Sequence, residues 1–217
     1  MIRLRPPARS LAFLARSLCA FLLVGLFCAL TSTGQGQRAK QETRRELTNS
    51  TRRDRLIQIG KSQVLIPDAV VLNEQGKRVR LYTDLIKDKV VLFNFFYTTC
   101  SYVCQMQGSD LSEVQTRLGK RLGKEVFLIS ISMDPANDTP ERLRHWAQAL
   151  GVKPGWTLVT SKSAEMKTML KTFTGNDPGP RERHYSVVFI GDDKSGKWIS
   201  ADGLSGPEGL IELINSL

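Results

Sequence analysis

The stretch that decides the fold is residues 90–104, VVLFNFFYTTCSYVC. Its first eight residues are apolar or aromatic except Asn94, and a short continuous run of this kind predicts a strand buried on both faces. Beyond Cys104, apolar residues recur at roughly helical spacing, at Met106, Leu111, Val114 and Leu118. The stretch therefore predicts a central strand that leads directly into a helix, with two cysteines at the junction.

Cys100 and Cys104 lie where the first turn of the predicted helix begins. The first N–H groups of a helix lack partners and the helix dipole favours negative charge, so thiolates are stabilised there. Residues four apart on a helix have Cβ atoms about 5–6 Å apart, whereas a relaxed disulfide needs about 3.5–4.5 Å. Two thiolates on one metal ion lie about 4 Å apart. The pair suits a metal at least as well as a disulfide, which it can still form if Cys100 lies just outside the helix.

The composition limits the possible functions. The 217-residue chain is long enough for one domain with a substantial core. Its formal charge of +10 is concentrated at one end, because residues 1–60 carry +8 and residues 61–217 only +2. The nearly neutral second part gives no support for a nucleic-acid footprint, so we expect no nucleic-acid partner. Only two of the four cysteines lie beyond the N-terminal apolar segment, which favours a redox or metal pair over a disulfide scaffold.

The N-terminal segment has the pattern of an export signal. Residues 1–16 carry four arginines and no acid, and residues 17–30 form an apolar run. This predicts a signal peptide or signal anchor over residues 1–31. We expect the membrane to be crossed, through residues 11–30, only if this segment stays uncleaved.

Residues 32–55 contain almost no large apolar residue and predict a flexible linker. The remaining residues, 56–217, predict one domain in which strands alternate with helices. The predicted strands and turns are strand–turn–strand over 64–81, strands at 90–97, 126–133, 156–159 and 186–190, and a closing hairpin over 192–200. The predicted helices follow Cys104, Thr139 with Pro140, Ser163 and Pro207. This order predicts an α/β sandwich around a mixed sheet.

Three features together resemble the SCO/SenC family of copper chaperones, within the thioredoxin-like superfamily. Cys100 and Cys104 are separated by three residues, where thioredoxins have two. Residues 132–143 read SMDPANDTPERL, and His184 stands just before a strand of the form Val-Val-Phe-Ile. The resemblance covers about residues 56–217. It implies a thioredoxin-like sandwich with a mixed central sheet flanked by helices and an N-terminal β-hairpin.

The resemblance also implies that Cys100, Cys104 and His184 bind one copper ion. Two thiolates and an imidazole form a soft, low-coordinate set suited to Cu(I), and a fourth ligand would allow Cu(II). By the same resemblance, the protein delivers copper to the binuclear copper site of a respiratory cytochrome oxidase. The expected partners are the oxidase subunit that carries this site or another copper carrier. The expected location is the periplasmic side of a bacterial cell envelope, secreted or anchored to the inner membrane.

The sequence departs from the family at two places and leaves a second function open. Ser101 and Gln105 occupy positions where the family usually has proline, and we expect their loss to loosen the loop and to shift its redox potential or metal affinity. The alternative function is a metal-independent thiol–disulfide oxidoreductase, in which Cys100 attacks a partner disulfide and Cys104 resolves the mixed disulfide. The two activities can coexist, because a recipient's cysteines must be reduced before they accept metal.

Other candidate residues have structural interpretations. His145 is predicted to lie on the polar side of a helix. Met106 and Met133 could be soft outer ligands, but their spacing favours packing in the core. Asp134 and Asp138 follow a strand end, where such folds place sites. For Asp138, a turn that caps the next helix and a role in supporting the site or docking a partner are both open.

Overall fold

The computed structural model describes residues 37–38, 41, 54–174 and 186–217. The chain divides into two units, Met1–Asn49 and Ser50–Leu217, and the second holds the strands and the helices α2 to α5. The predicted signal segment and nearly all of the predicted linker lie outside the described residues. Among the helices that are described, none is long and apolar enough to cross a bilayer.

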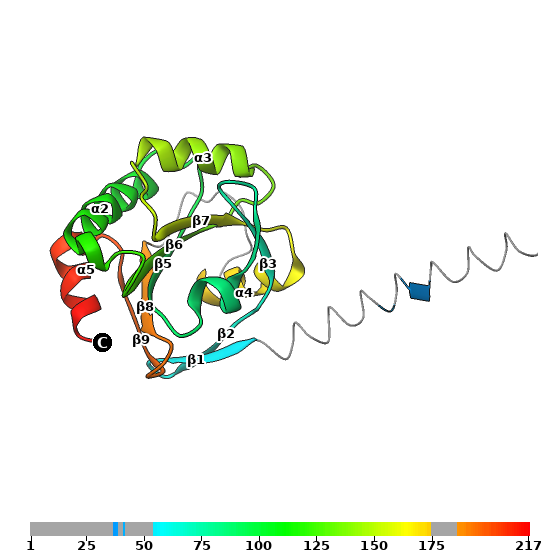
Figure 1. The fold of residues 1–217 in the computed structure, drawn as a ribbon, viewed down its shortest axis with the longest axis horizontal. Helices are drawn as coiled ribbons and strands as arrows, with labels where there is room; N and C mark the ends of the chain where they lie inside the picture. The colour runs from blue at the N-terminus through cyan, green and yellow to red at the C-terminus, as the bar shows by residue number, and fades with distance from the viewer. Residues whose placement is uncertain (1–36, 39–40, 42–53, 175–185) are drawn as a thin grey trace, which may run out of the picture. The chain divides into compact units, whose positions relative to one another are not determined.

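Within the described residues, one mixed sheet of nine strands runs in the order β2-β1-β9-β8-β5-β6-β7-β3-β4 (Figure 1). Its centre is β5 (Val90–Phe96), which is parallel to β6 (Val126–Ser132) and antiparallel to β8 (Val187–Asp192). The other strands are β1 (Arg55–Ile59), β2 (Ser62–Ile66), β3 (Val70–Asn73), β4 (Arg78–Arg80), β7 (Trp156–Thr160) and β9 (Lys197–Asp202). The predicted central strand is confirmed.

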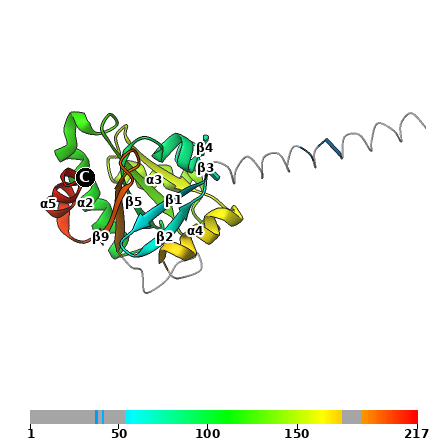
Figure 2. The ribbon, with the colours of Figure 1, turned by 90° about the horizontal axis from the view of Figure 1, so that it is seen from below.

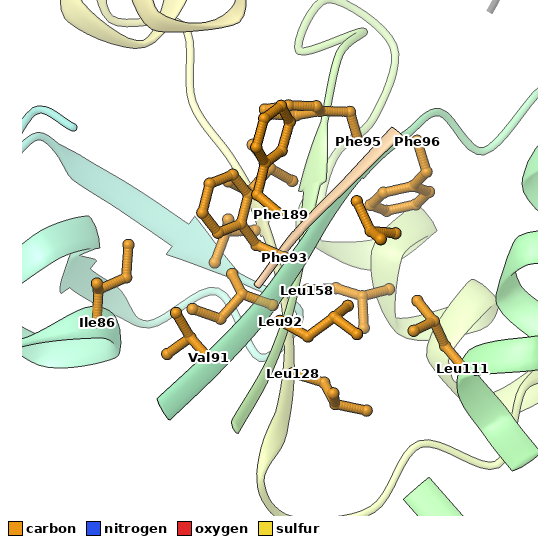
Figure 3. Close-up of a cluster of buried hydrophobic side chains, with 14 of the residues drawn as sticks. Ile86, Val91, Leu92, Phe93, Phe95, Phe96, Leu111, Leu128, Leu158 and Phe189 are labelled. Atoms are coloured by element: carbon orange, nitrogen blue, oxygen red, sulfur yellow. The ribbon is translucent and has the colours of Figure 1, made fainter. Parts of the chain in front are cut away.

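Helices cover both faces of the sheet, which explains why every residue of β5 except Val90 is buried (Figure 1). The helices are α2 (Val103–Leu118), α3 (Pro140–Ala149), α4 (Ala164–Thr174) and α5 (Gly206–Asn215). Trp146 of α3 stacks on Phe96 with ring centroids 5.9 Å apart. Phe173 of α4 packs against Phe93 and Phe95. Alternate residues of β5 therefore pack into the core on opposite faces of the sheet (Figure 3).

The beginning of the domain differs from the prediction. Within the expected strand–turn–strand over residues 64–81, the hairpin of β3 and β4 is confirmed, whereas residues 64–66 belong to a separate strand, β2, which pairs with β1. Figure 2 shows the β1–β2 hairpin beside β9. Pro67 ends β2 because it has no N–H group to continue the ladder. The sequence analysis missed β1 although three of its five residues are apolar, because Leu56, exposed opposite Leu65, and Ile57 break the alternation typical of a half-buried strand.

Two predicted helix starts are confirmed by their caps. The Thr139 hydroxyl accepts a hydrogen bond from the Arg142 N–H group at 3.4 Å, and Pro140 occupies the first helical position. The Ser163 hydroxyl accepts from the Met166 N–H group at 3.3 Å at the start of α4. The architecture is the predicted α/β sandwich around a mixed sheet, with an N-terminal hairpin.

Candidate functional site

The two thiols lie close together at the junction between β5 and α2. β5 ends at Phe96 and α2 begins at Val103, so Cys100 lies just outside the helix and Cys104 lies in its first turn. The Cys104 N–H group donates a hydrogen bond to the Cys100 sulfur at 3.3 Å. Both thiols are free, and both residues are buried, with exposed fractions of 7% and 1%. Because Cys100 lies just outside the helix, the condition under which the two cysteines can form a disulfide is met.

The hydrogen bonds around Cys100 favour its thiolate. Burial by itself raises the pKa of this thiol. The Cys104 thiol, the N–H groups of Cys104 and Tyr102, and the Tyr97 hydroxyl all donate to it, and together they lower the pKa of Cys100 below its ordinary value. Cys100 is therefore the thiol that loses its proton first.

Cys104 has the opposite tendency. Burial raises the pKa of its thiol, the hydrogen bond to Cys100 adds to this effect, and the negative charges on Cys100 and Asp138 raise it further. The site therefore pairs a thiol that ionises readily with one that keeps its proton. A metal ion that binds both must displace the proton of Cys104.

Asp138 fixes the loop that carries the first thiol. Its carboxylate is buried, and it accepts hydrogen bonds from the Thr98 hydroxyl at 2.5 Å and the Thr98 N–H group at 3.2 Å. It also accepts from the Ser132 hydroxyl at 2.6 Å. Arg142 donates to the Thr98 hydroxyl from the outside, at 3.1 Å. Because Thr139 caps α3, the capping role predicted for Asp138 is wrong. The contacts of Asp138 with Thr98 and Ser132 are consistent with the support role, which stays a prediction.

The remaining candidates lie in different surroundings. Asp134 is buried and accepts from the Asn137 side chain at 2.8 Å. Met133 packs in the core as predicted, whereas the core position expected for Met106 is wrong, because 43% of this residue is exposed. His145 is exposed on α3, as predicted.

The third proposed ligand, His184, lies outside the described residues. Within the part of the chain that the structure describes, no three His, Cys, Asp or Glu residues cluster closely enough to hold a metal ion. The described donor set is thus the pair of thiols, which suits a soft metal such as Cu(I).

Sequence reasoning missed three residues around the thiols. The Tyr97 hydroxyl donates to Cys100, and the hydroxyls of Thr98 and Ser132 donate to the Asp138 carboxylate. The available signals were the polar pair Thr98–Thr99 at the end of an apolar strand and the place of Ser132 at the start of the motif over residues 132–143. The partners of these residues are set by tertiary structure.

Comparisons with known proteins agree on one family. The model of the SCO1/SenC family matches residues 64–190. A SCO1 protein homolog of Bacillus subtilis (strain 168) is 32% identical over 104 residues, which cover 46% of this chain and 52% of that protein. The chain thus matches about half the length of this curated relative.

Solved structures share the fold. A SCO1/SenC family lipoprotein from Bacillus anthracis str. Ames is 25% identical with a TM-score of 0.58, over 69% of this chain and 92% of that one. BsSco, described with a disulfide switch and as a member of the Sco family of cytochrome c oxidase assembly proteins, is 25% identical with a TM-score of 0.56, over 68% and 90%. Bradyrhizobium japonicum ScoI with copper bound is 23% identical with a TM-score of 0.55, over 68% and 95%. These matches confirm the predicted thioredoxin-like sandwich.

Proposed function

Because the chain belongs to the SCO1/SenC family, we propose that it is an exported copper-binding protein that carries copper for the binuclear copper site of a respiratory cytochrome oxidase. The observation that carries this proposal is the pair of reduced thiols, Cys100 and Cys104, joined by a hydrogen bond at the start of α2. A copper-bound structure of Bradyrhizobium ScoI and the description of BsSco as an oxidase assembly protein support the choice of cargo and recipient.

The proposed ligands are Cys100, Cys104 and His184. The two thiols supply a soft pair, and a neutral imidazole completes a three-coordinate site that favours Cu(I). The ion is cargo, so the site must release it as well as hold it. A three-ligand site leaves room for a recipient's ligand to attack, unlike a closed four-ligand structural site.

The proposed location is the periplasmic side of a bacterial cell envelope. The basic start and apolar run within residues 1–31 support export, and residues 11–30 would anchor the protein to the inner membrane if the segment is not cleaved. The proposed partners are the oxidase subunit with the copper site or another copper carrier.

A Cu(I) titration of the reduced protein, in competition with a chelator, tests this function. We expect one tightly bound equivalent in the wild type and loss of tight binding in Cys100→Ser and in Cys104→Ser. A wild-type protein that binds Cu(I) no more tightly than these two variants contradicts the proposal.

The opposite pKa shifts of the two thiols favour a second candidate, a thiol–disulfide oxidoreductase. The Cys100 thiolate would attack a partner disulfide, forming a mixed disulfide and releasing one partner thiolate. Cys104 would then lose its proton and attack the Cys100 sulfur, releasing the second partner thiol. The partner gains two electrons, and Cys100 and Cys104 end as a disulfide. Reduction of a model disulfide by a protein that binds no copper would favour this candidate over the carrier.

A further inference from the structure

Exposed apolar side chains stand beside the two thiols. Within the part of the chain that the structure describes, five large hydrophobic side chains are exposed, and two of them lie within two residues of a cysteine. These two are Tyr102, with an exposed fraction of 69%, and Met106, with 43%. The Met106 N–H group donates to the Tyr102 carbonyl at 3.1 Å, so the two residues are neighbours across the first turn of α2. Together with the half-buried Val103 between them, they form a surface that we name the thiol rim.

The segment that carries the thiol rim has no charge. Residues 98–109 contain no Asp, Glu, Lys or Arg, although these types make up 24% of the chain. The exposed residues beside the rim, Ser101 and Gln105, are polar but uncharged. A single exposed apolar residue is common on a protein surface. A tyrosine and a methionine side by side on an uncharged surface have instead the composition of the centre of a protein–protein interface, where both types are enriched and charged residues are depleted.

The chemistry of the thiols brings a partner into contact with this rim. The exposed fractions of Cys100 and Cys104 are only 7% and 1%, so little of either residue reaches the solvent. Disulfide exchange needs direct attack of one sulfur on another, and transfer of Cu(I) between sulfur ligands needs the same close approach. The Tyr102 N–H group donates to the Cys100 sulfur, so the rim begins next to the reacting atom. A partner's cysteine that reaches Cys100 therefore brings its neighbouring residues onto the rim.

We propose that the thiol rim is a docking face for the protein partner of the two thiols, and that it takes an uncharged, apolar segment that carries a cysteine. The inference deepens the proposed function, on which it rests, because it states the chemistry of the surface that the recipient presents. Tyr102 and Met106 lose apolar surface to water when such a segment covers them, which favours the complex. A charged segment would lose hydration there, and the rim offers no opposite charge in return.

Reaction of the reduced, metal-free protein with three cysteine peptides tests this inference. Each peptide carries its cysteine as a mixed disulfide with thionitrobenzoate, and the flanking residues are Leu and Phe, two Glu or two Lys. The Cys100 thiolate attacks the peptide sulfur, forms a protein–peptide disulfide and releases thionitrobenzoate, whose absorbance gives the rate. We expect the apolar peptide to react at least about tenfold faster than either charged peptide. Its rate should stay within about twofold between low and high salt, because no charge steers the encounter.

Tyr102→Ser and Met106→Ser alter the rim, and Leu56→Ser and Leu65→Ser are matched controls. Leu56 and Leu65 are exposed to similar extents, 55% and 48%, but they pair with each other on the β1–β2 hairpin at the edge of the sheet. The measured quantity is the rate with the apolar peptide divided by the rate with the mixed disulfide of mercaptoethanol and thionitrobenzoate. This ratio cancels changes in the reactivity of Cys100 itself. We expect it to fall at least about fivefold in each rim variant and to stay within about twofold of the wild type in the controls.

Three outcomes overturn the inference. The first is a wild-type protein that reacts with either charged peptide as fast as with the apolar one. The second is a rate ratio in the rim variants that matches the wild type, or that falls equally in the controls. The third is a wild-type dimer, seen by sedimentation, that the rim substitutions dissociate, because it assigns the face to a second copy of the chain. The assay contains no copper, so a wild type that binds no Cu(I) ends the proposed function while the peptide rates still decide whether the rim selects an apolar segment.

Discussion

Asp138 accepts a 2.5 Å hydrogen bond from the Thr98 hydroxyl across forty positions of sequence. This contact links the loop after β6 to the loop that carries Cys100, and the same carboxylate also accepts a hydrogen bond from the Ser132 hydroxyl. The two loops therefore behave as one support for the thiols. The charge of Asp138 acts on the site as well, because it contributes to the raised pKa of Cys104.

Asp138→Asn should destabilise the domain by about 1–3 kcal/mol, because the amide nitrogen cannot accept from the Thr98 or Ser132 donors and leaves one of them buried and unpaired. Equilibrium denaturation measures this loss. Asp134→Asn is the matched control, since that carboxylate accepts from one side chain, Asn137. Equal, small effects of the two substitutions would contradict the support role of Asp138.

The two thiols should react in a fixed order. Because hydrogen bonds lower the pKa of Cys100 while burial raises that of Cys104, limited iodoacetamide should label Cys100 first. The labelling rate should fall as the pH drops through the lowered pKa of Cys100. Peptide mapping by mass spectrometry identifies the labelled residue. First labelling at Cys104 would show that the two pKa shifts have been assigned to the wrong thiols.

Copper affinity should fall as the pH falls. Copper must displace the proton of Cys104, whose pKa is raised by burial, so at least one proton is released on binding. Near neutral pH we expect the Cu(I) affinity to fall at least about tenfold for each unit of pH. Competition titrations at several pH values measure this slope, and a flat profile would argue against ligation by thiolates.

Part of this arrangement could be predicted from sequence, because strand and helix periods and caps are local signals. The apolar run of β5 and the cap at Thr139 both lay where the pattern indicated. The bond between Asp138 and Thr98 could not be predicted, since it depends on β5 and β6 lying side by side.

The helix phase of α2 shows where the sequence interpretation went wrong. Gln107 precedes Leu111, Val114 and Leu118 by four, seven and eleven residues, which are spacings of one helix face. Met106 precedes Leu111 by five residues, so it lies on a different face of the helix, where it is exposed. Hydrophobicity favoured the methionine, whereas the geometry of the helix buries the glutamine. The polar residue Asn94 in the middle of β5 is its partner.

A further prediction concerns the ionisation of Tyr82. Tyr82 donates to Asp193 Oδ2 at 3.0 Å, and burial, this hydrogen bond and the charge of Asp193 raise the pKa of Tyr82 to about 12. Because the phenol pKa is higher in the folded protein than in the unfolded chain, the neutral phenol stabilises the fold at pH values below the ordinary pKa of about 10. This contribution is lost as the pH rises from there towards 12. Ultraviolet titration should show one tyrosine ionising late, and Tyr82→Phe should remove that step. A late step that persists in the variant would refute the assignment.

The most direct test of the central claim compares Cu(I) affinity in His184→Ala and His145→Ala, because these are the two histidines of the chain and His145 is exposed on α3. If His184 completes the site with Cys100 and Cys104, His184→Ala loses most of the affinity and His145→Ala keeps it. Equal affinity in the two variants and the wild type would contradict the three-ligand site and leave a dithiol protein without its proposed cargo.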